Sequence, residues 1–505
     1  MISLSVAGSS SANLMNRYHM TDARYITTTL PYVNSDPHIG FAAEIITADA
    51  LARYWRLIRD EVFFTTGTDE HGQKIWEKAN EQGEEVQSYV DHYAGRFKEL
   101  KDALELSYDR FIRTTDADHI VAAQAFWSRC MESGDIYKKK YKGLYCVGDE
   151  MFLRESDLID GRCPNHPNID PIMLEEENYF FALSKYGPYL LEEYLNEPGV
   201  IIPEWRREEA ISFVANGLED FSISREKARL TWGIPVPGDE SQVMYVWFDA
   251  LTNYISTLGW PQDTEGNFKK FWAEGKTLQL AGKDQVRFQS IMWQAMLKSA
   301  GLPPTRQVSY HGFINSGGQK MSKSLGNVIS PFDLVARYGT EATRYLLIRH
   351  VHPFEDTDIT WERLDEWYTA NLTNGLGNIV ARVMKLAETH LEKGMDAAIG
   401  EGMPKEYDDA FATYDVHAAA NHVWSRIQLL DQQITDTEPF KVVKVDLLKG
   451  KELIAAEVLE LSVIARMLQP LMPETSRIIM DAIKNNVKPE NLFPRLLTTE
   501  AVAQL

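Results

Sequence analysis

The chain has 505 residues, of which 44% are hydrophobic and 25% are charged, a composition typical of a globular protein with several domains. Its formal net charge of −21 argues against an indiscriminate nucleic-acid binder but allows a specific RNA partner where basic residues cluster. No run approaches the ~20 apolar residues of a membrane span, and three cysteines make no disulfide scaffold, so we expect a cytoplasmic protein that binds neither membrane nor DNA.

Residues 1–22 are rich in Ser and Ala but lack the basic leader and the apolar core of a signal peptide, which predicts a flexible tail. Residues 23–136 then alternate strand, turn and helix patterns, with a helix at about 38–59 and a strand at 62–66. This order predicts a βαβ unit, hence parallel strands with a right-handed crossover. Ligands of such sheets bind at the carboxyl ends of the strands, so we expect the functional site there.

The alternation stops over residues 137–234, where loops, aromatic residues, Cys and His predominate, and it resumes over residues 235–308. We therefore expect an α/β fold in which a Rossmann-like parallel sheet is interrupted by an insertion. Residues 309–370 carry a basic, glycine-flanked loop. Over residues 371–505 strand signals vanish and apolar residues recur in steps of three and four, which predicts an α-helical bundle.

A His-Ile-Gly sequence, residues 38–40, opens the first long helix. The free backbone N–H groups and the dipole of a helix N-terminus attract phosphate, His38 adds a donor, and Gly40 lets a ligand approach closely. The same pair is also common as a plain helix cap, so the motif alone is a weak indication. Because the chain has neither a lysine P-loop nor a glycine-rich dinucleotide fingerprint, a nucleotide site must be built another way.

A second segment, GGQKMSKSLG at residues 317–326, places Lys320 and Lys323 on a glycine-flanked loop. Two lysines on such a loop can close over a polyphosphate and neutralise the charge that develops during in-line displacement. Without further context, a solvated basic turn is the better interpretation of two lysines.

The insertion contains two close-spaced pairs of possible metal ligands, Cys146 with Asp149 and Cys163 with His166. Short loops that each present two ligands are typical of structural tetrahedral zinc sites, and a carboxylate oxygen can ligate Zn²⁺. The spacing predicts one structural zinc site, with a metal-free knuckle as the alternative. We expect the third cysteine, Cys130, to be a buried thiol outside this pattern.

The His-Ile-Gly-Phe and Lys-Met-Ser-Lys-Ser signatures, separated by an interrupted Rossmann-like fold, resemble those of the class I aminoacyl-tRNA synthetases. Within that class the chain is similar to the methionyl-tRNA synthetases from Arg24 onward, through six stretches in family order. They are TLPY at 29–32, TGTDEHG at 66–72, YVWFDA at 245–250, AGKD at 281–284, KMSKS at 320–324 and NGLGN at 374–378.

The resemblance implies ATP-dependent activation of L-methionine to methionyl-adenylate, with Mg²⁺ bound to ATP, and transfer of the methionyl group to the 3′ end of tRNA(Met). The ATP-binding residues that it implies are His38, Gly40, Glu44, Gly282, Asp284, Lys320 and Lys323. The catalytic residues that it implies are His38, Lys320, Lys323 and Arg225.

The resemblance also implies a methionine pocket in which Asp69 pairs with the ammonium group. Its other expected lining residues are Leu30, Tyr32, Trp247, Ala250, Tyr254, Gln285 and Gln289. Polarisable aromatic walls suit a thioether, although aromatic core is the alternative for Trp247 and Tyr254. The family commonly has isoleucine and histidine where this chain has the two glutamines, so we expect a more polar wall here.

In the helical bundle the resemblance implies anticodon contacts from Asn378, Arg382 and Phe440, the last standing where family members carry a tryptophan. It further implies that residues 309–370 contact the tRNA stem, and we expect a monomer. Two alternatives remain. A related class I synthetase for another small amino acid is suggested by the glutamine pair, and a non-catalytic tRNA-binding paralogue by Phe41, which replaces a second histidine of the family motif.

Overall fold

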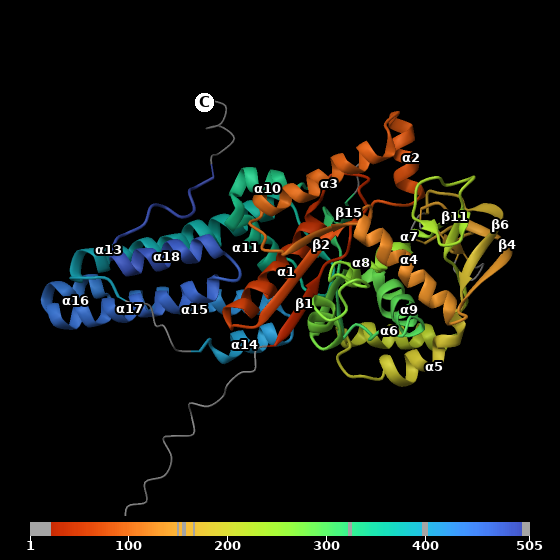
Figure 1. The fold of residues 1–505 in the computed structure, drawn as a ribbon. Coiled ribbons are helices and arrows are strands. Elements are labelled where there is room, and N and C mark those ends of the chain that lie inside the picture. The colour runs from red at the N-terminus through yellow and green to blue at the C-terminus, as the bar shows by residue number, and fades with distance from the viewer. Residues whose placement is uncertain are drawn as a thin grey trace, which may run out of the picture.

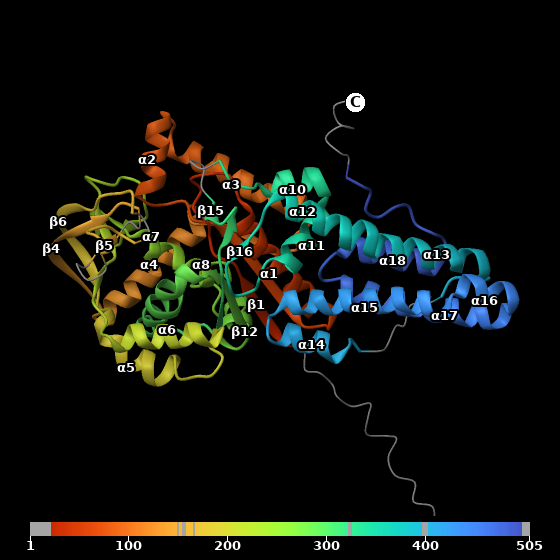
Figure 2. The ribbon, with the colours of Figure 1, turned by 180° about the vertical axis from the view of Figure 1, so that it is seen from behind.

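The computed structural model describes residues 22–148, 151–153, 158–164, 167–321, 326–395 and 402–496. A central parallel sheet with its covering helices lies between small antiparallel sheets at one end of the molecule and a helical bundle at the other (Figures 1 and 2). None of the helices in these ranges is long and apolar enough to cross a membrane.

The central sheet has six strands, all parallel, and its chain order reverses in the middle. The spatial order is β3 (Arg110–Arg113), β2 (Glu61–Thr68), β1 (Ala23–Thr27), β12 (Lys276–Gly282), β13 (Gln307–His311) and β7 (Ile201–Ile202). The inner strands are buried on both faces, as helix-covered parallel strands must be. The predicted Rossmann-like parallel sheet is therefore confirmed, with its switch point between β1 and β12.

Helix α1 (Ile39–Leu57) follows β1 and is buried along most of its length. It packs beside β2, against α11 (Thr340–His350) and against α14 (Lys405–Ala412), where Tyr54 stacks on Phe411 with ring centroids 4.0 Å apart. The helix that begins at the ligand end of the sheet thus also contacts the first helices of the C-terminal region.

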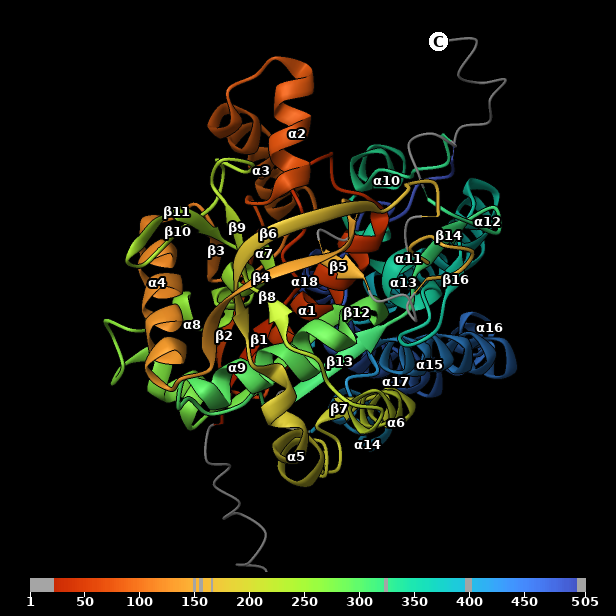
Figure 3. The same ribbon diagram turned by 90° about the vertical axis from the view of Figure 1, so that its right-hand side faces the viewer.

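The antiparallel sheets lie at the end of the molecule that faces the viewer in Figure 3. One has the order β5 (Met151–Leu153), β4 (Ile136–Cys146), β6 (Ile172–Phe181) and β8 (Phe221–Ser222). The other has the order β10 (Pro235–Val236), β11 (Asp239–Met244) and β9 (Ser224–Glu226). Strand β7 comes from the same stretch of chain but pairs with β13, so this stretch also completes the central sheet.

The C-terminal region is helical, as predicted. Its long helices are α13 (Asn378–His390), α15 (Val416–Thr437), α17 (Leu447–Leu468) and α18 (Pro473–Asn485), with the shorter α16 (Pro439–Val445) at the far end. The apolar residues spaced by three and four in α17 are buried, which confirms the expected core-facing stripe.

The remaining elements are shorter or cover the sheets. The helices are α2 (Gln73–Gln82), α3 (Val86–Ala103), α4 (Ala117–Glu132), α5 (Gly187–Tyr189), α6 (Glu204–Ala215), α7 (Val246–Leu251), α8 (Asn253–Ser256), α9 (Trp293–Ser299), α10 (Pro331–Tyr338) and α12 (Trp361–Trp367). The strands are β14 (Ile314–Ser316), β15 (Gln319–Lys320) and β16 (Thr357–Asp358).

Candidate active site

The carboxyl ends of the central strands bring the predicted site residues to one edge of the sheet. Tyr32 and Asp69, which follow β1 and β2, form an isolated parallel bridge, and the Asp69 N–H donates to the Pro31 carbonyl at 3.0 Å. Gly282 ends β12, and His311 ends β13. The switch point between β1 and β12 lies in the middle of this group, where ligands of such sheets bind.

His38 caps the N-terminus of α1, where its Nδ1 accepts the Gly40 N–H at 3.0 Å. A Cβ on Gly40 would lie 2.7 Å from the His38 ring, so glycine is required for this cap. The surrounding protein and the Lys320 ammonium lower the pKa of His38, although its ring is exposed. A neutral ring that accepts at Nδ1 carries its proton on Nε2, which leaves a donor at the helix N-terminus.

Phe41 belongs to the hydrophobic core and not to the exposed N-terminus of α1. Its side chain is 8% exposed and meets Phe97 of α3 edge to face, with ring centroids 5.4 Å apart. The aromatic residue that follows Gly40 therefore joins α1 to α3.

The basic loop begins as a tight hairpin between β14 and β15. Gly317 and Gly318 have φ of 63° and 75°, a conformation that favours glycine, and the Gly318 N–H donates to Asp358 Oδ1 at 2.6 Å. Lys320 is exposed, and its Nζ lies 5.1 Å from the centroid of the Phe313 ring. Lys323 lies outside the described residues.

Glu44, one turn into α1, is buried and joins three segments of the site. Its Oε1 accepts the Thr29 N–H at 2.6 Å and the Thr29 hydroxyl at 2.8 Å, while Oε2 lies 2.7 Å from His311 Nε2. The His311 Nδ1 lies 2.8 Å from the Gly312 carbonyl. Although burial opposes protonation, hydrogen bonding to Glu44 and the charge of that carboxylate raise the pKa of His311.

His311 was missed from the sequence because its partner is 267 residues away. Its one local signal is the His-Gly pair at the end of a strand. This pair resembles the His-Ile-Gly sequence at residues 38–40, but it lacks the intervening residue.

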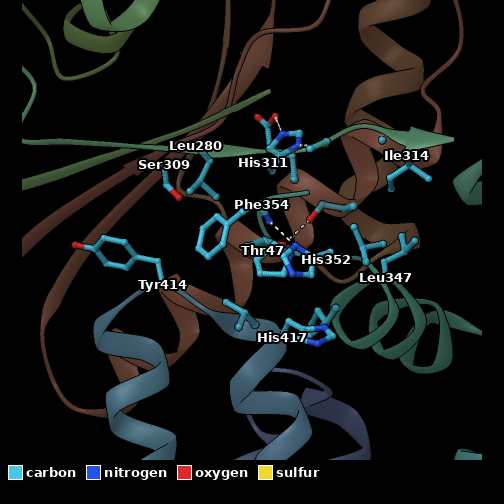
Figure 4. A pocket seen from close by; sticks show the side chains of 18 residues that line it. Thr47, Leu280, Ser309, His311, Ile314, Leu347, His352, Phe354, Tyr414 and His417 are labelled. Carbon is cyan, nitrogen blue, oxygen red and sulfur yellow. Dashed lines mark hydrogen bonds and ion pairs between the residues drawn. The ribbon is translucent and has the colours of Figure 1, made fainter. Parts of the chain in front are cut away.

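A cavity of about 50 Å³ adjoins Glu44 and His311 (Figure 4). Gly40, Glu44 and His311 line it from the sheet side, whereas Tyr414 lines it from the turn between α14 and α15 and His417 from the first turn of α15. This end of the candidate site therefore borders the start of the helical region.

Gly282, the last residue of β12, lies close to Asp284, because a Cβ on Gly282 would stand 2.7 Å from Asp284 Oδ1. Asp284 is exposed, and the Gln285 amide donates to its Oδ2 at 3.1 Å. The Lys283 ammonium, on the same turn, pairs with Asp356 at 2.6 Å. In this conformation the Gln285 side chain lies beside Asp284, which is predicted to bind ATP.

The predicted amino-acid pocket is aromatic. Trp247 stacks on Phe288 with ring centroids 4.0 Å apart, and its edge meets Tyr32 at 6.3 Å. The buried Gln289 donates through Nε2 to the Tyr254 hydroxyl at 2.6 Å. Burial, with smaller contributions from the Glu44 and Asp69 carboxylates, raises the pKa of Tyr254. Among the other expected lining residues, Ala250 is buried and Leu30 is half-buried.

A buried network that was not predicted lies directly behind this pocket. Asp249, next to Ala250 in α7, lies 2.7 Å from His71 Nδ1 and 2.9 Å from His119 Nε2. His119 Nδ1 in turn lies 2.9 Å from the Ser256 hydroxyl. The two histidine contacts hold the pKa of Asp249 below its ordinary value despite its burial. The network joins the end of β2, α4 and α7, which fixes the backbone around the pocket.

Arg225 of β9 belongs to the insertion and is 3% exposed. Its guanidinium donates to the Ser222 hydroxyl at 3.0 Å and to the Ser224 carbonyl at 2.7 Å. The guanidinium carbon lies 4.6 Å from the centroid of the Tyr245 ring. Tyr245 precedes α7, so Arg225 is linked to the segment that carries Trp247.

Cys146 and Cys163 are both buried and share a small cluster with Leu153. The other two predicted metal ligands, Asp149 and His166, lie outside the described residues. Cys130, the third cysteine, is a buried residue of α4, and burial raises the pKa of its thiol to about 12, as expected for an inert thiol.

In the bundle, Asn378 is exposed at the start of α13, and Arg382, one turn later, pairs with Asp431 at 2.6 Å. Phe440 of α16 is 39% exposed, which leaves its ring accessible.

Comparisons with known proteins agree on one family. The family model described as tRNA synthetases class I (M) matches residues 24–170 and 167–384. Proteins named methionine–tRNA ligase from Thermosynechococcus vestitus and Thermotoga maritima are 38% and 39% identical to the chain. Each alignment covers 92% of this chain, and they cover 90% and 76% of those proteins.

The solved structure of Mycobacterium tuberculosis methionyl-tRNA synthetase in complex with methionyl-adenylate is 34% identical, with a TM-score of 0.86. The match covers 94% of this chain and all of that one. Sequence and fold thus agree over nearly the whole length, and the chain belongs to the methionyl family of class I tRNA synthetases.

Proposed function

We propose that this chain activates L-methionine with ATP and transfers the methionyl group to the 3′ end of tRNA(Met). The observation that carries the proposal is the convergence of His38, Asp69 and His311 on the switch point of the parallel sheet, in a chain of this family. In the first step a methionine carboxylate oxygen attacks the α-phosphorus of ATP and pyrophosphate leaves. In the second, a hydroxyl of the terminal ribose attacks the methionyl carbonyl and AMP leaves.

In the ATP site we assign the phosphates to His38, the N-terminus of α1 with Gly40, and the lysines 320 and 323. The exposed Lys320 and the donor on His38 suit this assignment, since both favour a negative ligand. Mg²⁺ bound with ATP would neutralise phosphate charge. We assign the ribose to Asp284 and Gly282.

We place the adenine of ATP near Glu44, whose contacts suit a residue that orients others. Its carboxylate already accepts hydrogen bonds from Thr29 and interacts with His311. We therefore propose that Glu44 fixes the Thr29 backbone and the His311 ring, which form the walls of the nucleotide site.

For methionine we assign the ammonium group to Asp69 and the side chain to the pocket around Tyr32, Trp247 and Tyr254. The contact between Gln289 and the Tyr254 hydroxyl supports a polar group at the buried end of this pocket. Aromatic faces beside a small polar boundary suit a thioether, which is polarisable and a weak acceptor. Arg225 is proposed to position the pocket through Tyr245.

We propose that tRNA spans the molecule as a partner of a monomer, with anticodon contacts from Asn378, Arg382 and Phe440. In the knuckle, Cys146 and Cys163 would hold Zn²⁺ with Asp149 and His166. The two thiols fit such a site, because both are buried in one small cluster. Zinc there would stabilise the fold of the insertion and take no part in the reaction.

Amino-acid-dependent exchange of pyrophosphate into ATP tests the proposed function. We expect exchange with methionine and at least tenfold less with any other amino acid. Preference for another amino acid would establish the related-synthetase alternative, and no exchange would establish the non-catalytic one. As a matched pair, Asp69→Asn should abolish most methionine-dependent exchange, on the order of 10²–10³-fold, because a desolvated ammonium loses its counter-charge. Asp220→Asn, remote from the nucleotide end, should leave exchange unchanged.

A further inference from the structure

Strand β16 and the segment before it carry two aspartates that the proposed function does not use. Asp356 directly precedes the strand, and Asp358 is its last residue. The strand lies parallel to β14 (Figure 3), with Ile314 opposite Thr357 and Asn315 opposite Asp358. Because β14 leads into the lysine loop, residues 317–326, both aspartates lie beside a part of the candidate ATP site.

This segment approaches the chain before β14 so closely that the neighbouring position requires glycine. A Cβ on Gly312 would lie 2.2 Å from the main-chain carbonyl carbon of Glu355, a distance that real Cβ contacts do not show. The Thr357 N–H donates to the Phe313 carbonyl at 2.9 Å, which fixes the segment to the residue that precedes β14. The two aspartates are therefore held in place by main-chain contacts.

Asp356 holds the turn after β12, which carries the proposed ribose ligand. Its two carboxylate oxygens lie 2.6 and 2.8 Å from the Lys283 ammonium, and Oδ1 also accepts the Phe313 N–H at 2.9 Å. Although partial burial opposes ionisation, the hydrogen bond from Lys283 helps to hold the pKa of Asp356 below its ordinary value. Lys283 directly precedes Asp284, so an unrestrained ammonium at this position would be free to pair with the ribose ligand. Asp356 therefore keeps Asp284 available.

Asp358 holds the hairpin from which the lysine loop continues. Its Oδ1 accepts the Gly318 N–H at 2.6 Å, at the turn between β14 and β15, where Gly317 and Gly318 both have positive φ. The Arg363 guanidinium donates to the Asp358 main-chain carbonyl at 2.9 Å and lies 3.8 Å from Oδ2 of its side chain. Lys320 follows this turn directly, at the end of β15. The contact with Asp358 therefore fixes the direction in which the loop leaves the hairpin.

The ring of Phe313 connects these two contacts. The Lys283 Nζ lies 4.6 Å from its centroid and the Lys320 Nζ lies 5.1 Å from it, so both ammonium groups lie over one aromatic ring. Since Asp356 accepts the N–H of the same residue, it also fixes the ring over which Lys320 lies. The ribose turn and the lysine loop are thus linked through one segment.

We propose that Asp356 and Asp358 are positioning residues that anchor two parts of the ATP site, the ribose turn and the lysine loop, to one short strand. The inference rests on the proposed function, which places ATP between these parts. Both parts are anchored before ATP binds, so binding orders fewer groups and the loop starts near the phosphates. Asp356 acts on the affinity for ATP because it keeps Asp284 free, and Asp358 acts on the rate because it directs the lysine loop.

The test of Asp358 compares loss of the acceptor with loss of the charge alone. Asp358→Ala removes the partner of the Gly318 N–H and should lower kcat for methionine-dependent pyrophosphate exchange roughly five- to thirtyfold, as the loss of one hydrogen bond does. Asp358→Asn keeps an acceptor oxygen and should recover most of this rate. KM for methionine should stay within about twofold in both variants, because the change lies outside the proposed amino-acid pocket.

The test of Asp356 uses the charge of its partner. Asp356→Asn still accepts the Phe313 N–H but no longer holds the Lys283 ammonium, and it should raise KM for ATP roughly three- to fivefold with kcat nearly unchanged. Adding Lys283→Met should restore KM for ATP, since no ammonium then remains to pair with Asp284.

The matched control is Asp239 of β11, which accepts the Lys138 ammonium at 2.9 Å and the Ser241 N–H at 3.1 Å. It has the same two kinds of partner within a small antiparallel sheet, so Asp239→Asn should leave kcat and both KM values unchanged. Equal loss of rate in both Asp358 variants, an unchanged KM for ATP in Asp356→Asn, or no recovery in the double variant would each overturn the assignment. Lower unfolding temperatures with unchanged kinetic constants would show a merely structural role and would overturn it as well. Absence of exchange in the unchanged chain would instead overturn the proposed function.

Discussion

Buried carboxylates are treated differently in the two halves of the molecule. In the parallel-sheet half, Glu44, Asp49 and Asp249 are each held by two or more hydrogen bonds or ion pairs. In the helical bundle, Glu457 of α17 is fully buried, and neither of its oxygens has a hydrogen-bond partner within the described ranges.

The difference shows how each half uses buried polar groups. An ionised carboxylate in the interior is costly unless it is paired, and pairing also fixes the atoms that hold it. The paired carboxylates fix the strand ends, α1 and α7, where the proposed ligands bind. The bundle is held by apolar packing, and its isolated acid remains protonated more readily, since burial raises the pKa of Glu457 to about 7.

The largest effect is expected from breaking the pair of Asp49 and Arg344. Both side chains are fully buried 2.8 Å apart, and Arg344 also donates to three main-chain carbonyl groups, two of them between α17 and α18. Arg344→Met should lower the free energy of unfolding by about 3–5 kcal/mol, because a charge and three acceptors lose their partner. Urea denaturation measures the loss.

The matched control for this change is Arg53→Met, because Arg53 pairs with the same carboxylate at 2.7 Å from a more exposed position. It should cost no more than about 1 kcal/mol. Equal losses of unfolding free energy for the two variants would show that the buried pair contributes no more to stability than the more exposed pair.

A smaller loss is expected from Asp249→Asn, which removes the charge shared by His71 and His119. One of the two buried imidazoles would then face the amide N–H group of the new asparagine where it now faces a carboxylate oxygen. This change should lower the free energy of unfolding by about 1–3 kcal/mol. Because the network lies behind the amino-acid pocket, KM for methionine in the exchange assay should rise together with the loss of stability. Ser256→Ala removes only the outer contact and should change both less. If KM stayed constant, the network would have no positioning role.

A stabilising change is expected in the bundle. Between pH 4.5 and about 7 the unfolded chain ionises Glu457 while the folded protein keeps it protonated, so stability falls as pH rises across this window. Glu457→Gln removes that loss. It should raise the free energy of unfolding at pH 8 by about 1–3 kcal/mol and change it little at pH 4.5. Thermal unfolding at the two pH values measures this, and equal shifts at both would contradict the assigned pKa.

The sequence predicted the features that depend on local patterns. The alternation of strand and helix patterns predicted the parallel sheet and the edge at which its ligands bind. The spacing of apolar residues by three and four in α17 predicted the helical bundle. The pairing of Asp249 with His71 spans 178 residues, and no local periodicity relates such positions. The apolar segment 246–251 is a helix, but a short apolar run is compatible with either a strand or a helix, so the sequence alone could not decide between them.

The smallest effect on activity is expected at Phe41, because within α1 of the parallel-sheet half it belongs to the apolar core and not to the proposed ligand site. His38 faces the proposed phosphates from the N-terminus of α1, whereas Phe41 packs on Phe97 in the core. Phe41→His would place a polar ring among apolar neighbours and should cost about 1–3 kcal/mol of stability. Adenylate formation should change less than tenfold, since His38, the helix N-terminus and the lysine loop already supply the phosphate contacts. Pre-steady-state formation of methionyl-adenylate measures the rate, with Phe41→Leu as the control for packing. A gain of orders of magnitude would mean that a histidine here reaches the phosphates, and that the core position of Phe41 withholds a transition-state donor from this chain.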